Sequence, residues 1–345
     1  MDTIYIARHG FRMAWHGNQL GLSPTGRPRD PVLTAHGIDQ VKLLAQHFAS
    51  LPEDQRPQMI VSSPYYRCVQ TAGPSAQTLD MDIHIEPGTF IKGPDCSVCQ
   101  LGGNQADDRS CIDEQSGITE WFPPVTSNTG YHPVPMRAST ISQYAPRVAS
   151  SQQWSPLVYP HRRGESIQDL HTRARRVLER IVQRCEQRGV RRVLLVSHAA
   201  TVIAMGRAMV EAEAEQTTDW SSGRGLEVGA GTASLSLYVR GEAAEKRGLA
   251  TEAAKSPTGW VQALNGSAEH LPDGVEREWT FKDIPGNVEE PGMGVGHVDE
   301  EAFEEAEMQR LEQAGVVADQ DAASVWGAGM ASRSGPGQES AKPRF

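Results

Sequence analysis

Cysteine, aromatic residues and long apolar runs are all scarce in this chain of 345 residues. Five cysteines are an odd number, which fits a reducing compartment better than the disulfide framework of a small secreted protein. No stretch of about 18 uncharged apolar residues occurs, which excludes a transmembrane helix. The first residues, MDTIYIARHG, lack the basic and apolar regions of a secretory signal. We therefore expect a protein of the cytoplasm or the nucleus that does not contact a membrane.

A metal centre has little support in the sequence. Cys96 and Cys99 form a single CxxC pair, with Cys111 downstream. A structural zinc site needs four ligands, and no second CxxC or HxxxH motif stands nearby. We therefore expect no zinc at this pair.

Basic residues are fewer than acidic ones, and the formal net charge is −10 at pH 7. An acidic chain of this kind is not expected to bind nucleic acid directly, although a local basic pocket can still bind phosphate. Residues 241–345 contain 20 acidic and 9 basic side chains, whereas residues 1–240 contain 23 and 24. This shift predicts a nearly neutral main domain over 1–240 and an acidic annex after it.

Short apolar segments alternate with amphipathic ones through the main domain. Strands are expected at residues 3–7, 59–63, 82–86, 192–197 and 232–239. Helices are expected at residues 34–51 with Thr34 as N-cap, directly after Pro64, at 166–188 and at 199–214. This alternation predicts an α/β sandwich with a mostly parallel central sheet.

Other segments depart from this alternation. Residues 88–116 have neither helical nor strand periodicity, so two interpretations stay open: an irregular insertion, or an artefact of the gene model such as a retained intron. Residues 241–256 have the composition of a linker, and residues 257–283 predict a small β-hairpin-like extension of the sheet. Residues 291–345 predict an acidic, largely disordered tail.

Polar side chains collect where the expected strands end. Arg8 and His9 follow the first strand, Arg67 lies shortly after the second, and His198 follows the strand RVLLVS. Because parallel strands end at the same edge of a sheet, we expect these groups to converge there. Two guanidiniums and two imidazoles suit a phosphate dianion, and a histidine nitrogen can attack phosphorus to form a phosphohistidine.

A phosphoryl transfer of this kind also needs a proton donor for the leaving alcohol. Glu120 is the best candidate because Ile118, Trp121 and Phe122 flank it, and apolar neighbours raise the pKa of a carboxyl group. Taken singly, each of the five residues fits an ordinary structural role better than a catalytic one. Their combination and order favour catalysis.

The motifs that contain these residues resemble those of a known family. RHG at 8–10, SSPYYRCVQT at 62–71 and SHA at 197–199 occur in the order typical of the histidine phosphatase superfamily, which is phosphoglycerate mutase-like. The resemblance covers roughly residues 1–240 and implies helices on both faces of the sheet. It implies His9 as phosphoryl acceptor, Glu120 as proton donor, and no metal or organic cofactor. It also implies a phosphate pocket of Arg8, Arg67 and His198.

A finer pattern narrows the resemblance. ARHGFRMAW at 7–15 is similar to a fungal subgroup that includes the phosphatase-like subunit of the RNA polymerase III factor TFIIIC. Arg12 then either joins the rim of the pocket or is a solvated loop residue. Two functions follow: a phosphomonoester hydrolase acting on a phosphorylated substrate, or a phosphatase-like scaffold with a protein partner at its C-terminal extension. Nothing resembles the substrate loops of the glycolytic mutase, which disfavours a mutase reaction.

Overall fold

A computed structural model describes residues 1–13, 24, 30–86, 138–149, 154, 164–210 and 227–281. Several sequence predictions lie outside these residues: the irregular stretch at 88–116 with its CxxC pair, Glu120, and the acidic tail at 291–345. Within the described part, no helix is both long enough and apolar enough to cross a membrane.

A six-stranded sheet forms the centre of the described chain, in the order β3-β2-β4-β1-β5-β6. Its strands are β1 (Thr3–Arg8), β2 (Met59–Ser62), β3 (Ile83–Ile85), β4 (Arg192–Ser197), β5 (Leu235–Val239) and β6 (Val261–Ser267). The first four strands in that order pair in parallel. β5 pairs antiparallel with β1 on one side and with β6 on the other. The prediction of a mostly parallel α/β sheet is confirmed.

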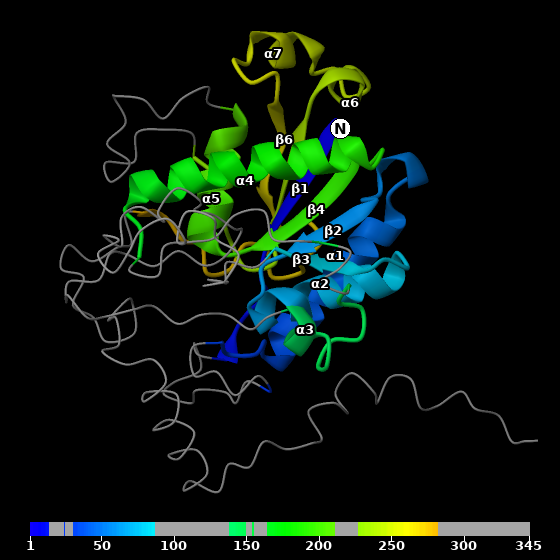
Figure 1. The fold of residues 1–345 in the computed structure, drawn as a ribbon, viewed down its shortest axis with the longest axis vertical. Helices are drawn as coiled ribbons and strands as arrows, with labels where there is room; N and C mark the ends of the chain where they lie inside the picture. Colours follow the sequence, from blue (N-terminus) through cyan, green and yellow to red (C-terminus); the bar gives the residue numbers. More distant parts are fainter. Residues whose placement is uncertain are drawn as a thin grey trace, which may run out of the picture.

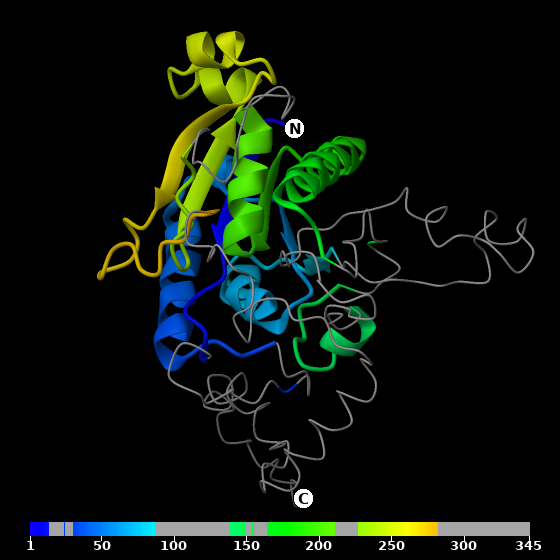
Figure 2. The ribbon, with the colours of Figure 1, turned by 90° about the vertical axis from the view of Figure 1, so that its left-hand side faces the viewer.

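Helices cover both faces of this sheet and complete a three-layer sandwich (Figures 1 and 2). On one face lie α1 (Ala35–Ser50) and α2 (Tyr66–Thr78), and on the other α4 (Ile167–Gln187) and α5 (Ala199–Val210). Successive strand residues point to opposite faces. In β1, Ile4 and Ile6 therefore pack with α4 and α5, whereas Tyr5 and Ala7 pack with α1 and α2.

Strand register places the polar chain segments at one edge. Arg8 at the end of β1 pairs with Ser197 at the end of β4, and Ser62 at the end of β2 pairs with Val196. The residues that follow β1, β2 and β4 therefore lie side by side at this edge. This is the edge at which ligands bind in open α/β sheets.

The region after residue 240 differs from its predicted form. Residues 241–256, predicted as a linker, contain the short helices α6 (Gly241–Glu245) and α7 (Ala250–Lys255). Only the first strand of the predicted hairpin exists in the described residues, as β6. The partner strand was expected at residues 278–282. As far as residue 281, where the described part ends, there is no strand, because this part of the chain bonds to the loop before β5 instead: the Glu278 carboxylate accepts from the Ala230 N–H. Two further short helices are η2 (Glu53–Gln55) and α3 (Ala138–Ile141).

The start of α4 offers a test of local stability. The Ser166 hydroxyl accepts from the Asp169 N–H at 3.1 Å, and the Asp169 carboxylate accepts from the Ser166 N–H at 3.0 Å, which is a complete capping box. We expect Ser166→Ala to lower the free energy of unfolding by about 1 kcal/mol, measured by urea denaturation. Ser166→Thr keeps the hydroxyl and is the control. Equal stability of Ser166→Ala and wild type would contradict the role of the cap.

Candidate active site

His9 follows β1 directly and is buried, with a relative exposure of 3%. Its ring Nδ1 lies 2.8 Å from the Gly10 carbonyl oxygen. A carbonyl oxygen can only accept, so Nδ1 of the neutral ring carries the proton and Nε2 carries the lone pair. The His9 backbone is fixed as well: its N–H donates to Ser197 O at 2.9 Å, and its carbonyl accepts from the Ala233 N–H at 3.2 Å. The ring is therefore held in place with an unprotonated Nε2, which is the form of a histidine that can act as a nucleophile.

The loop after His9 is pressed against α1 and α2. The Gly10 N–H donates to the Thr71 hydroxyl at 3.1 Å, and that hydroxyl donates to the Arg67 carbonyl at 2.7 Å. On α1, a Cβ added to Gly37 would lie 2.1 Å from the Phe11 carbonyl oxygen. Only glycine permits this approach, so the first turn of α1 packs directly against the backbone of the loop after His9.

His198 follows β4 and faces the same site. Its Nδ1 lies 3.3 Å from the Arg67 guanidinium, and its Nε2 lies 2.8 Å from the Ser63 hydroxyl. Because a guanidinium only donates, Nδ1 of His198 accepts, and Nε2 of the neutral ring carries the proton. The His9 and His198 ring centroids are 5.4 Å apart. The two strand ends therefore present an unprotonated Nε2 on His9 and, on His198, an Nε2–H that donates to the Ser63 hydroxyl.

Arg67 lies in the first turn of α2, is fully buried and has a buried acidic partner. Its Nη1 lies 3.2 Å from Oδ1 of Asp30, and the two side chains are 0% and 2% exposed. Both carboxylate oxygens of Asp30 also accept from the Tyr66 N–H, at 2.9 Å each. Asp30 thus holds the N-terminus of α2 and the guanidinium at once.

Burial and arginine charges together set the protonation of both histidines. Burial first, and then the charges of Arg67, Arg8 and Arg12, hold the pKa of His9 well below its ordinary value of 6.5. The pKa of His198 is depressed in the same way, by burial, by Arg67 and by its other cationic neighbours. Both rings are therefore neutral at pH 7, and the positive charge resides on the guanidiniums. This distribution suits a dianionic phosphoryl group.

The structure thus brings together five of the six residues singled out from the sequence: Arg8, His9, Arg12, Arg67 and His198. Glu120 lies outside the described residues. A family model of the histidine phosphatase superfamily (branch 1) matches residues 4–89 and 135–226, just over half of the chain. The chain belongs to the histidine phosphatase superfamily.

Individual proteins are similar to this chain in sequence or in fold. The chain is 28% identical over 291 residues to the transcription factor tau 55 kDa subunit of Saccharomyces cerevisiae, a match that covers 81% of this chain and 59% of the relative. The ecdysone phosphate phosphatase of Bombyx mori, solved with tungstate, superposes with a TM-score of 0.51 at 16% identity, covering 77% of this chain and 93% of that one. A phosphoserine phosphatase of Entamoeba histolytica has a TM-score of 0.40 at 16% identity, covering 79% and 100%.

Three polar partners of the groups in this site were not predicted from the sequence. Asp30 stands in RDPVLT, where nothing local marks an acidic side chain as the partner of Arg67, which lies 37 residues away. Ser63 stands within the recognised SSPYYRCVQT motif, and only its position at the end of β2 indicated a role. A third partner, Glu276, lies beyond the residues that the family model matches.

The depressed pKa of His9 predicts how this member of the superfamily responds to acid. We expect the His9 ring to stay neutral as the pH falls from about 8 through 6.5, the range in which an ordinary histidine takes up a proton. The unfolded chain binds that proton more readily than the folded one, so His9 lowers the free energy of unfolding below pH 6.5. Carbon–proton NMR of the histidine rings, with His9 assigned from its absence in His9→Ala, measures the titration. A midpoint near 6.5 would contradict the burial and charge argument.

Proposed function

We propose that this protein is a phosphomonoester hydrolase that acts through a phosphohistidine at His9. The observation that carries the proposal is the hydrogen bond from His9 Nδ1 to the Gly10 carbonyl at 2.8 Å, beside a buried arginine cluster. It leaves the lone pair on Nε2 of a ring that is neutral at physiological pH. A nucleophile and an anion pocket are the two parts that phosphoryl transfer requires.

The first step forms the phosphoenzyme. His9 Nε2 attacks phosphorus, a new N–P bond forms, and the P–O bond to the leaving alcohol breaks. Arg8 and Arg67 bind the equatorial oxygens, and His198 exchanges its Nε2–H bond to Ser63 for one to these oxygens as their charge grows. We assign the proton for the leaving alkoxide to Glu120 on the sequence resemblance, and Arg12 to the rim of the pocket. The residues matched by the family model include Arg8, His9, Arg67 and His198 but not Glu120.

The second step releases inorganic phosphate. Water attacks the phosphorus of phospho-His9, its proton passes to the Glu120 carboxylate, and the N–P bond breaks. His9 returns to its neutral form and Glu120 to its acid form, so the cycle closes without an oxidant, reductant or cofactor. Hydrolysis of p-nitrophenyl phosphate by the full chain, beside His9→Ala, tests the proposal.

A second function is supported by the yeast relative. We propose that the chain also acts as a subunit of a transcription factor assembly in the nucleus, because it is 28% identical to a subunit of transcription factor tau. The extension at residues 257–283 is the proposed contact with a protein partner. Tagged full-length chain should then co-purify with RNA polymerase III transcription factor subunits. Loss of that association on deleting β6, with the main domain still folded, would support this contact; an unchanged association would place it elsewhere.

These two functions are separable by experiment. A catalytic subunit hydrolyses aryl phosphate in a manner that depends on His9 and also co-purifies with partners. A scaffold co-purifies equally well as wild type and as His9→Ala, and neither protein has turnover. The substrate is a phosphorylated molecule in the first case, and no substrate is needed in the second.

A further inference from the structure

A segment outside the family match reaches the centre of the site. After β6, residues 268–281, here called the return segment, run back across the end of β1. The Thr232 N–H donates to the Glu276 carbonyl at 2.8 Å, and Val275 and Glu276 lie within 3.1 Å of where a Cβ on Gly231 would be. The return segment is therefore packed against the loop before β5, the loop whose Ala233 N–H donates to the His9 carbonyl.

Arg8 is bonded to this segment. Its Nη1 donates to the Arg277 carbonyl oxygen at 2.5 Å and also to the Ala230 carbonyl oxygen. One Nη nitrogen carries two hydrogens, so two carbonyls on different segments fix the plane of the guanidinium. Arg277 has a φ of 49°, a left-handed conformation that is rare for a residue with a side chain. The backbone thus adopts an unfavourable conformation at the residue that supplies the acceptor.

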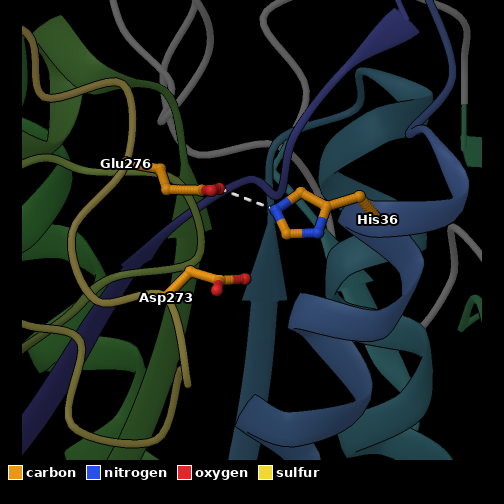
Figure 3. Close-up of side chains that lie close together, drawn as sticks. All are labelled: His36, Asp273 and Glu276. Atoms are coloured by element: carbon orange, nitrogen blue, oxygen red, sulfur yellow. Dashed lines mark hydrogen bonds and ion pairs between the residues drawn. The ribbon is translucent and has the colours of Figure 1, made fainter.

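Glu276, the residue before that acceptor, anchors the segment to α1. Its Oε2 accepts from His36 Nε2 at 2.7 Å and from Gln40 Nε2 at 2.7 Å. Figure 3 shows Glu276 and Asp273 on the return segment facing His36 across the gap to α1. The amide oxygen of Gln40 accepts in turn from the Phe11 N–H at 3.0 Å, in the loop after His9. One carboxylate therefore connects the acceptor of Arg8 to the loop that carries the nucleophile.

We propose that the return segment positions Arg8 for oxyanion binding, and that Glu276 is the positioning residue that fixes it. The inference rests on the proposed phosphatase function, in which Arg8 binds the phosphoryl group. A guanidinium whose plane is already fixed loses less conformational freedom when an oxyanion binds, so preorganisation raises affinity. The segment thereby makes the C-terminal extension part of the phosphate pocket, in addition to any role in partner binding.

The test uses the full chain with Glu276→Ala, in buffers that contain EDTA. The chelator is needed because His36, Asp273 and Glu276 offer ligand atoms within 4.8 Å of one another, and a trace metal there would also hold the segment. We expect the Kd for inorganic phosphate and the KM for p-nitrophenyl phosphate to rise about tenfold, with kcat changed much less. Isothermal titration and steady-state kinetics give the two values.

Three further variants keep the result interpretable. Glu276→Gln keeps an oxygen acceptor and should restore most of the affinity, which a loss of general packing would not allow. His36→Ala removes one donor at a partly exposed position, so it should fold even if Glu276→Ala does not, and it should raise the phosphate Kd to a smaller extent. Glu269→Ala, on the same segment but exposed, is the matched control and should bind phosphate like wild type.

The outcomes separate the inference from the proposed function. Wild-type affinity in folded Glu276→Ala and His36→Ala, with a wild type that turns over, would overturn the positioning role alone. Tighter phosphate binding in Glu276→Ala would also overturn it, since the carbonyls would then compete with the oxyanion for Arg8. A wild type that neither binds phosphate nor hydrolyses p-nitrophenyl phosphate would refute the phosphatase proposal and the positioning role together.

Discussion

Alanine in place of His9 should reduce kcat for p-nitrophenyl phosphate by on the order of 10³-fold or more, because the reaction then has no nucleophile. The fold should persist. The ring makes its hydrogen bond to the neighbouring Gly10 carbonyl, and the backbone bonds of residue 9 do not depend on the side chain. The buried His9 ring has a depressed pKa and is neutral near pH 7. Alanine therefore removes the packing of the ring but no ion pair.

The measurement compares wild type, His9→Ala and a control histidine variant at the same folded concentration. His47→Ala is suitable, since His47 lies in the last turn of α1, at the opposite end from the turn that touches the His9 loop. Wild type should also form a phosphoenzyme that is labile in acid and stable in base, as expected of phosphohistidine, and His9→Ala should not. Turnover retained in a clean His9→Ala preparation would refute the nucleophile; no turnover in any folded preparation would favour the scaffold function.

Among the proposed substitutions, loss of the Asp30 carboxylate should lower the free energy of unfolding the most. Asp30→Ala leaves the fully buried guanidinium of Arg67 without its carboxylate and leaves the Tyr66 N–H at the start of α2 without its acceptor. Removing one partner of a buried ion pair costs about 3–5 kcal/mol of unfolding free energy. No side chain within α2 caps this helix end, which adds to the effect.

Chemical denaturation of Asp30→Ala against wild type measures this loss. Asp30→Asn keeps an oxygen for the Tyr66 N–H and should lose less, and Asp39→Ala, which breaks an exposed pair with Lys42, should change stability by under about 0.5 kcal/mol. Inorganic phosphate should stabilise Asp30→Ala more than wild type, because the dianion then supplies the missing negative charge beside Arg67. A loss equal to that of Asp39→Ala would contradict the role of the buried pair.

Sequence patterns predicted the layers of this fold because each pattern is local. The continuous apolar runs in TIYIAR and RVLLVS reflect strands whose two faces are both buried, and the spacing of Val41, Leu44 and Phe48 reflects one buried face of α1. Thr34 was predicted as the N-cap and does accept from the Gly37 N–H. The prediction of a second hairpin strand at residues 278–282 was wrong over the described residues 278–281, because Trp279 and Phe281 pack into the core there without strand pairing.

The motifs at the strand ends likewise indicated the site from the sequence alone, because parallel strands end at one edge and RHG, SSPYYRCVQT and SHA each lie at the end of a strand. What the sequence alone determined is therefore the α/β layering and the histidine and arginine groups of the pocket. Only the tertiary structure decided which groups hold them: Asp30 on Arg67, Ser63 on His198, and the return segment on Arg8. These contacts join residues 37, 135 and 269 positions apart, and such pairs leave no periodicity or spacing in the chain, because their geometry exists only once the sheet has formed.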